Sequence, residues 1–347
     1  MKQNNNRLFT LDVTRGFTVL FIPFIHSWMM FGDQQAQHSS IASVLSFIAE
    51  WPGAQLFMVH MGIGFSYRQS GTFRTVMFRT LILFSMAYAL NVIKFILPFL
   101  IGILPAKFQI DIQAANMLSL FCIGDILHFA ALALPVLFIV KKFPQYGISA
   151  IVLLFICCFA APHIWLVGAN ITNPFLQHGT SLFNCAPPQT YFPFFPWIVY
   201  PLAGLCIGYF LQEQDSIFFL PLFIVGIVLS LPGYFFGQHL TESFYRTTPW
   251  KTLQHLGFVC CWLPVWYVLL RIVNKNKLFV FFEFLGRNIT TIYLIQWPLI
   301  FWFLPFIEYN SNGTVATISY AFTITVITVA IAKCFISLRK SLHFKPG

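Results

Sequence analysis

The stretch LDVTRGFTVLFIPFIHSWMMF (residues 11–31) is mostly apolar and is long enough to cross a lipid bilayer. It carries Asp12 and Arg15 near one end and His26 deep in the run. No small-x-small cleavage site follows it, so we expect it to remain as the first membrane span. An ionisable imidazole at that depth is costly in lipid and points to a functional role.

The rest of the chain has the same apolar character. Of its 347 residues, 58% are hydrophobic and only 9% are charged, and the mean hydropathy is +0.76. A soluble domain typically carries about 25% charged residues. The composition therefore indicates a polytopic membrane protein, and no polar stretch is long enough for a separate soluble domain. We expect residues 1–347 to form a single integral-membrane domain.

The expected fold is an all-α bundle of about ten transmembrane helices. Helices satisfy their own backbone polar groups in lipid, and the alternating ten-residue strands of an outer-membrane barrel are missing from the sequence. Runs of about 20 mostly apolar residues place the spans at 14–31, 42–66, 80–102, 113–140, 146–168, 191–211, 217–237, 254–272, 278–306 and 315–338.

The basic residues give the orientation. One set of loops holds Lys2, Arg7, Arg68, Arg74, Arg79, Lys141, Lys142, Arg271, Lys275, Lys277, Arg339, Lys340 and Lys345, and the opposite set holds Lys107, Arg246 and Lys251. Positive charge accumulates on the cytoplasmic side, so both termini are expected there. The same pattern explains the net charge of +10 without a nucleic-acid partner. The cysteines lie mostly in apolar runs and show no metal spacing, so we interpret them as packing residues.

Ionisable residues inside the spans usually face the bundle interior. They are Arg15, His26, Glu50, His60, Lys94, Asp125, His128, Glu283, Arg287 and Lys333. Lys333 can snorkel to the inner face, and Glu283 and Arg287, at i and i+4, can pair with each other. His60 is most simply a satisfied core histidine.

Arg15 and His26 share one face of a helix. Their spacing of eleven residues leaves a net rotation of about 20° and separates them by roughly 16 Å along the axis. A guanidinium fork suits a phosphate, and a histidine is the commonest general base near neutral pH. A satisfied core histidine is the structural alternative for His26.

Asp125 and His128 form a second pair, at i and i+3, in FCIGDILHFAAL. The aspartate can orient the histidine or hold a substrate hydroxyl, and the alternative is a local polar patch between helices. Two segments on the outer side, 168–190 and 237–251, mix aromatic and hydrogen-bonding residues. Each is either an ordinary connection or a lid over a membrane cavity.

Several stretches resemble the transmembrane acyltransferase superfamily. RLFTLDVTRGFTVLFIPFIH has the arginine, ten residues, histidine signature of the acyltransferase 3 family, and its LD..RG is more similar to the heparan-α-glucosaminide N-acetyltransferase-like branch. GAQLFMVHMGIGFSYRQS, YFPFFPWIVYPLAGLCIGYFL and FFEFLGRNITTIYLIQWPLI resemble later spans of that branch, in family order. Gln296 stands where many relatives have a late-span histidine, so this position offers hydrogen bonding and no proton transfer.

The resemblance implies transfer of an acyl group, most simply acetyl, from cytoplasmic acyl-CoA to a sugar hydroxyl or amine of an envelope glycan or glycolipid. His26 is then the general base or an acyl carrier, with Asp125 or His128 orienting it. The residues implied to hold the coenzyme are Arg15, Arg68, Arg74 and Arg79. The residues implied on the substrate side are Asn288, Tyr293, Gln296 and Arg287, the first three as oxyanion donors. No metal is implied.

Two other functions share the same spans and buried charges. A transporter or flippase for a small polar or lipid-linked molecule would move substrate without consuming acyl-CoA, and a non-catalytic scaffold would use the charges for packing. The acyl chain, the acceptor and the oligomeric state stay open. We expect a bacterial inner membrane, because the chain is compact and shows no targeting segment.

Overall fold

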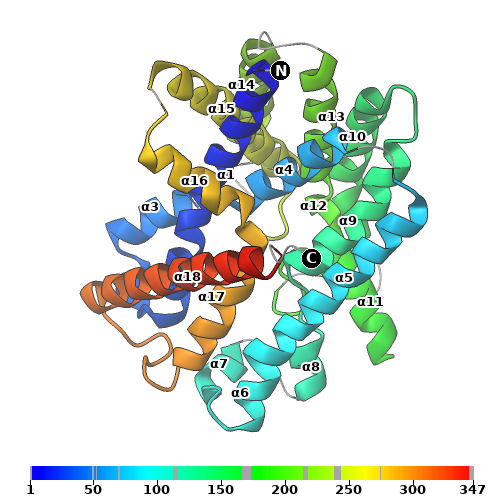
Figure 1. Ribbon diagram of the computed structural model, residues 1–347. Coiled ribbons are helices and arrows are strands. Elements are labelled where there is room, and N and C mark those ends of the chain that lie inside the picture. The colour runs from blue at the N-terminus through cyan, green and yellow to red at the C-terminus, as the bar shows by residue number, and fades with distance from the viewer. Residues whose placement is uncertain are drawn as a thin grey trace. The chain divides into compact units, whose positions relative to one another are not determined.

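The computed structural model describes residues 2–48, 51, 53–68, 71–111, 116–165, 173–185, 187–213, 218–237, 244–273 and 275–343. Over these residues the chain is all-helical (Figure 1), without a named strand and with two isolated β-bridges, Gly32 to Asn312 and Gly124 to Thr190. The chain divides into two compact units. Unit 1 comprises Met1–Ala49, Val92–Ala114 and Val273–Gly347, and unit 2 comprises Glu50–Asn91 and Ala115–Ile272.

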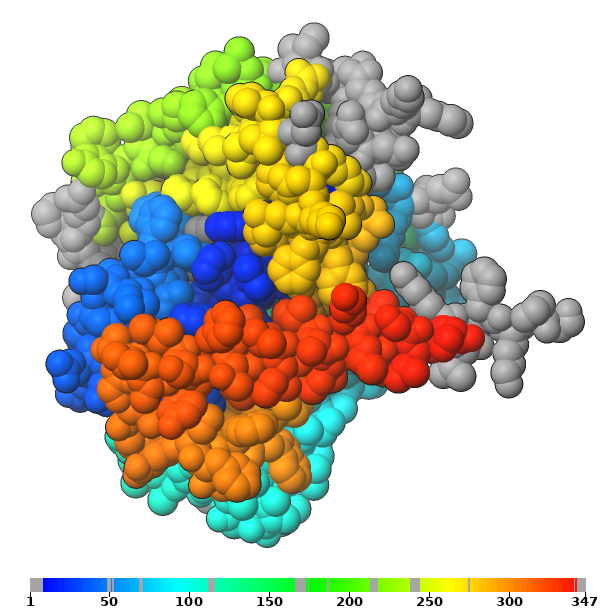
Figure 2. All heavy atoms as spheres, turned by 60° about the vertical axis from the view of Figure 1, so that its left-hand side comes forward, coloured from blue at the N-terminus to red at the C-terminus, as the bar shows by residue number. Residues whose placement is uncertain are grey.

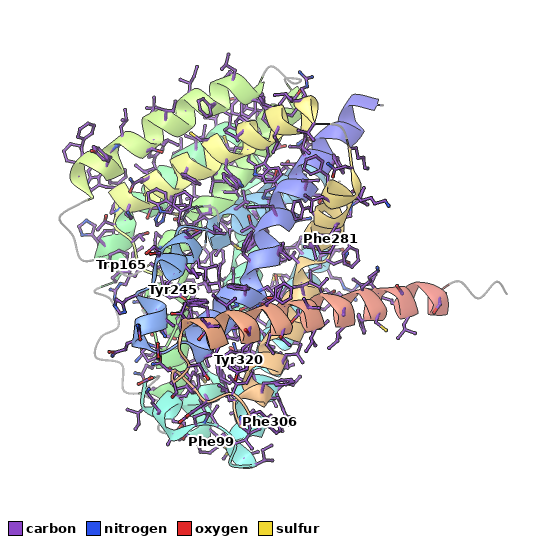
Figure 3. The ribbon with its side chains drawn as sticks, turned by 90° about the vertical axis from the view of Figure 1, so that its left-hand side faces the viewer. Phe99, Trp165, Tyr245, Phe281, Phe306 and Tyr320 are labelled. Atoms are coloured by element: carbon purple, nitrogen blue, oxygen red, sulfur yellow. The ribbon has the colours of Figure 1, made fainter. Side chains whose placement is uncertain are left out.

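Unit 1 is built from the two ends of the chain and one central insertion. Its elements are α1 (Lys2–Phe31), α2 (Gln34–Gln37), α3 (Ser40–Ile48), the π-helix η2 (Val92–Ile96), α6 (Leu97–Leu100), α7 (Ala106–Asp111), α16 (Lys277–Arg287), α17 (Ile289–Phe303) and α18 (Thr314–His343). Figure 2 shows the orange and red side chains of α17 and α18 along one face of this unit. Tyr320 of α18, labelled in Figure 3, meets the ring of Phe31 edge-on at 6.3 Å.

Unit 2 holds the middle of the chain. Its elements are α4 (Ala54–Tyr67), α5 (Phe73–Asn91), α8 (Met117–Phe121), α9 (Ile126–Val140), α10 (Tyr146–Ile164), α11 (Pro174–Asn184), α12 (Phe194–Trp197), α13 (Val199–Glu213), α14 (Phe219–Phe236) and α15 (Pro249–Ile272). Its buried core includes Trp197, Tyr200 and Phe129.

The described helices include six that are long and apolar enough to cross a membrane. They are Phe73–Leu100, Tyr146–Ile164, Phe194–Gln212, Phe219–Phe236, Pro249–Ile272 and Thr314–Arg339. A seventh span is possible if α16 and α17, bent by 77°, cross together. An integral membrane protein is therefore confirmed by these helices, while ten spans and cytoplasmic termini stay predictions.

Three expected spans are interrupted. The stretch 42–66 is divided between α3 and α4, and Pro52 and Gly53 in its sequence disfavour a helix interior. The stretch 113–140 is divided between α8 and α9, which begin after the capping residues Asn116 and Asp125. The stretch 278–306 bends at Asn288, which ends α16 and precedes α17. At the second break the side chains of Asn116 and Asp125 cap the helices that follow them. At the third, the Asn288 side chain does not cap α17 and donates instead to the Phe284 carbonyl near the end of α16.

In unit 1, α1 and α16 pack with their backbones in close contact, and they run side by side in Figure 1. Gly16 faces Gly286 at this crossing: a Cβ atom on Gly16 would collide with the Phe282 carbonyl, and one on Gly286 would collide with the Asp12 carbonyl. Only glycine allows this approach, which is typical of helix pairs in membranes. The crossing brings the LD..RG and GRN motifs together.

In unit 2, α4 and α13 meet in the same way. A Cβ atom on Gly62 would collide with the Pro201 carbonyl, and one on Gly204 would collide with the Val59 carbonyl. These glycines belong to two of the motifs that carry the family resemblance. The motifs therefore mark a close helix crossing in each unit.

Candidate active site

His26 lies in a polar and aromatic cluster between α1 and α17 of unit 1. Gln296 Nε2 lies 3.0 Å from His26 Nδ1. The ring of Trp297 stacks on the imidazole at 4.3 Å with an interplanar angle of 24°, and the Tyr293 ring lies edge-on at 6.5 Å. Tyr293, Gln296 and Trp297 are at i, i+3 and i+4, so one face of α17 presents all of them to the histidine.

Lys94 adds a positive charge to this cluster. The side chain is 3% exposed and lies on η2, a π-helix, and π-helical turns are frequent at functional sites. Its Nζ lies 5.1 Å from the ring centroid of Trp297 and 4.6 Å from that of Phe95. Both distances are within the range of a cation–π interaction. The indole of Trp297 therefore contacts both the imidazole and the ammonium group.

Two buried polar atoms in the cluster have no hydrogen-bond partner among the described residues. They are Gln296 Oε1, an acceptor, and Trp297 Nε1, a donor. Gln296 is fully buried. Buried polar groups are normally paired, and an exception in a native structure requires an explanation. A substrate that offers both a donor and a carbonyl oxygen would satisfy the two atoms.

A chain of ion pairs joins α1 to α16. Asp12 accepts from Arg15 at 2.7 Å and from Arg287 at 2.9 Å, and Arg287 also pairs with Glu283 at 2.6 Å. The i, i+4 pairing of Glu283 with Arg287 is confirmed. Arg15 and Arg287, both predicted to contact a ligand, thus share one carboxylate in this structure.

Asn288 closes the bend between α16 and α17. Its Nδ2 donates to the Phe284 carbonyl at 2.7 Å. The amide N–H donors of both Asn288 and Gln296 are thus engaged, one with a helix end and one with the imidazole.

Asp125 and His128 belong to unit 2, where they form a capping box at the start of α9. Asp125 Oδ1 accepts from Ile126 N at 2.6 Å, and His128 Nδ1 accepts from Asp125 N at 3.1 Å. The His128 ring also packs edge-on against Tyr88 at 4.5 Å. This arrangement stabilises the first turn of α9. His60, also in this unit, is buried and hydrogen-bonds through Nδ1 to the Leu56 carbonyl at 2.8 Å.

Arg68, Arg74 and Arg79 also belong to unit 2. Arg68 and Arg79 line one cavity with Lys141 and Lys142, and Arg74 is not part of its lining. The four predicted coenzyme-binding arginines are therefore found in two places, Arg15 on α1 and the others at and after the end of α4.

Two residues of the His26 cluster were missed as site residues from the sequence. Lys94 was recognised only as an ionisable residue in an apolar run, and Trp297, next to Gln296, resembled any membrane aromatic residue. In the part of the chain that the structure describes, no group of three or more His, Cys, Asp or Glu side chains is arranged to hold a metal ion.

Fold and site together define an integral membrane protein with a half-buried histidine in contact with the buried side chains of Gln296 and Tyr293. Residues 7–239, more than half of the chain, match the family model described as "Heparan-alpha-glucosaminide N-acetyltransferase, catalytic". The chain belongs to this family, which implies a membrane-embedded acetyltransferase. No curated protein and no solved structure matched the chain at a significant level. The matched residues include His26 and Lys94, and α17 lies beyond them.

Proposed function

We propose that this protein transfers an acetyl group from acetyl-CoA, or a related acyl-CoA, to an amine or hydroxyl group of a sugar, with His26 as the general base. The observation that carries the proposal is the cluster of His26, Gln296 and Trp297, in which a buried donor and a buried acceptor lack partners among the described residues. The family supports the acetyl group and an amino-sugar acceptor.

Gln296 controls which nitrogen of His26 can accept a proton. A neutral imidazole has one N–H donor and one acceptor nitrogen. An amide oxygen facing Nδ1 accepts from Nδ1–H and leaves the lone pair on Nε2, which is the basic form. An amide nitrogen facing Nδ1 puts the proton on Nε2 instead. In the structure Gln296 Nε2 faces Nδ1, and Oε1 has no partner in the described part of the chain. If the amide turns over, Oε1 accepts from Nδ1–H and Nε2 becomes the group without a partner.

In this mechanism Trp297 and Lys94 stabilise the reacting carbonyl. The acceptor nitrogen or oxygen attacks the thioester carbon and gives its proton to His26 Nε2. The carbonyl oxygen becomes negative and accepts from Trp297 Nε1–H, next to the Lys94 charge. The carbon–sulfur bond then breaks, and the thiolate takes the proton from His26 as it leaves. Tyr293 borders the imidazole and is placed to contact the acceptor.

The alternative chemistry passes through a covalent acyl-histidine, in which His26 itself attacks the thioester. It predicts an acetylated enzyme with a mass increase on the peptide that contains His26. The direct mechanism predicts unmodified enzyme throughout turnover.

The proposal includes the membrane arrangement inferred from the sequence: ten spans, both termini in the cytoplasm, and a bacterial inner membrane. With this orientation Arg15 is at the cytoplasmic edge and His26 is deeper, so a thioester entering from the cytoplasm reaches the imidazole. The acceptor then approaches from the opposite side or from the bilayer as a glycan or glycolipid.

The test uses the full chain in lipid nanodiscs with acetyl-CoA and free glucosamine as the acceptor probe. We expect release of the CoA thiol together with acetylated glucosamine, detected by mass spectrometry. Movement of a sugar across proteoliposomes without consumption of acetyl-CoA would contradict the proposal and favour a transporter. Wild-type protein that neither transfers acetyl groups nor hydrolyses the thioester would contradict it as well.

A further inference from the structure

A cavity of about 440 Å³ opens in unit 2 where the end of α4, the start of α5 and the end of α9 meet. Four cationic side chains line it: Arg68, Arg79, Lys141 and Lys142. The described residues around the cavity include no Asp or Glu. Such a concentration of unopposed positive charge is expected to attract an anion.

Lys141 has a structural task in this cavity. Its Nζ donates to the carbonyl oxygens of Phe65 and Ser66, at 3.0 and 2.7 Å, and to that of Arg68. Phe65 and Ser66 are in the last turn of α4 and Arg68 is its C-cap residue, and a lysine commonly satisfies carbonyls at a helix end. All three ammonium protons are therefore used, and the backbone of Arg68 is fixed beside the cavity.

Arg68, Arg79 and Lys142 are the cations left to bind a ligand. In the described part of the chain neither arginine forms an ion pair with a carboxylate. Burial lowers the pKa of the Arg68 guanidinium, and the nearby charge of Arg79 lowers it further. A phosphate group between the two guanidinium groups would relieve this repulsion and accept paired hydrogen bonds from both.

The start of α5 also favours an anion at this place. Gly71, Thr75 and Val76 line the cavity, and α5 begins at Phe73. The first backbone N–H groups of a helix and its dipole attract negative charge. The cavity thus combines a helix N-terminus with two guanidinium groups that lack a carboxylate partner among the described residues.

We propose that this cavity binds a phosphate group, held by Arg68 and Arg79 with Lys142 at the rim. Two ligands carry a phosphate group of this kind: the nucleotide end of acyl-CoA and the headgroup of an anionic phospholipid. The choice of acyl-CoA rests on the proposed function. Apolar side chains at the start of α5 and just after α9 are exposed, with Phe73 53%, Phe78 64% and Phe143 54% accessible. Exposed phenylalanines beside a cationic cavity suit the boundary between lipid headgroups and acyl chains.

The experiment measures binding by the full chain in nanodiscs of phosphatidylcholine. CoA affinity is measured by calorimetry, and retention of added phosphatidylglycerol is measured by native mass spectrometry. The variants are Arg68→Gln and Arg79→Gln. The matched control is Arg271→Gln, because Arg271 is an exposed arginine of the same unit and does not line the cavity. Lys141 is left unchanged because it holds the end of α4.

We expect binding of one probe to weaken about tenfold in each test variant, as a lost charge-assisted hydrogen bond predicts, and to stay unchanged in Arg271→Gln. Loss of CoA binding identifies the nucleotide end of the coenzyme as the ligand, and loss of phosphatidylglycerol retention identifies the lipid headgroup. The proposal is overturned if both probes bind the test variants as they bind wild type, or if Arg271→Gln weakens binding equally. Neither CoA affinity nor phosphatidylglycerol retention requires acetyl transfer. The same binding losses measured in an inactive His26→Ala background would therefore support the phosphate site even if the proposed function failed.

Discussion

At the scale of single residues, the contact of His26 with Gln296 is the feature that most affects the chemistry. The imidazole has one nitrogen 3.0 Å from an amide and one ring face against an indole. An amide can offer either a donor or an acceptor to Nδ1, so it does not by itself fix the tautomer. A carboxylate at position 296 would fix it, because it only accepts.

Substitution of Gln296 tests this control of the tautomer. We expect Gln296→Leu to lower kcat roughly tenfold, which is the size of one lost hydrogen bond. Gln296→Glu should keep or raise kcat, because its carboxylate accepts from Nδ1–H and leaves Nε2 basic. Steady-state kinetics with acetyl-CoA and glucosamine give both values. An inactive Gln296→Glu protein that is still folded would show that a donor to Nδ1 is needed, and His26 would then not be the base.

Trp297 makes a second prediction at this scale. Trp297→Phe keeps an aromatic ring against the imidazole and removes only the N–H donor. Loss of one oxyanion donor lowers kcat by about a hundredfold or more, and KM for acetyl-CoA should change little.

The matched control for Trp297 is Trp28→Phe. Trp28 is a tryptophan whose buried Nε1, like that of Trp297, has no partner among the described residues, but its ring stacks on Phe24. Equal losses of kcat in the two variants would assign the effect to packing and contradict a role for the Trp297 N–H in catalysis.

At the scale of helices, the close crossing of α1 and α16 positions the site. Gly16 and Gly286 let the backbones touch, and Asp12 then reaches both Arg15 and Arg287. Since α16 leads directly into α17, this crossing also sets where Gln296 and Trp297 lie relative to His26.

Alanine at Gly16 should separate the two helices. Overpacking a tight contact typically costs about 1–3 kcal/mol, so we expect Gly16→Ala to lower the melting temperature in detergent and to reduce activity. The control is Gly64→Ala, because an added Cβ there meets no atom within 4 Å and alanine favours a helix. If Gly16→Ala melts with wild-type or higher stability, the crossing is not as close as described.

Much at the scale of helices could be predicted from the sequence. The apolar runs predicted an all-helical membrane chain, and the i, i+4 spacing predicted the pairing of Glu283 with Arg287. The breaks within three spans were harder to see, because a single Asn or Asp capping residue does little to the average hydropathy of a long run. Asp125 was expected on a helix face shared with His128, and it is the capping residue just before that helix.

The composition of the His26 cluster could be predicted only in part. Gln296 and Tyr293 were expected on the substrate side because they fall in a motif, and both border the imidazole. Lys94 and Trp297 come together only through the packing of η2 against α17, about 200 residues apart in sequence. Hydropathy and local spacing contain no information on such a contact.

At the scale of the whole molecule, the chain forms two helical units, and one of them contains both terminal segments of the chain. The distribution of Lys and Arg predicts that both ends are cytoplasmic. A green fluorescent protein fused after Gly347 should therefore fluoresce in a bacterial host, and an alkaline phosphatase fused there should be inactive. An active phosphatase fusion would reverse the predicted orientation and the proposed cytoplasmic route for acyl-CoA.

The most direct test of His26 as the general base is the single-turnover rate of acetyl transfer by His26→Gln beside wild type, with the fold checked by melting temperature. Glutamine keeps a hydrogen-bonding side chain on α1 but cannot take a proton, so we expect the rate to fall about a hundredfold or more, the size of a lost general base, with little change in CoA binding. A His26→Gln protein that is folded and transfers acetyl groups at the wild-type rate would contradict this role for His26.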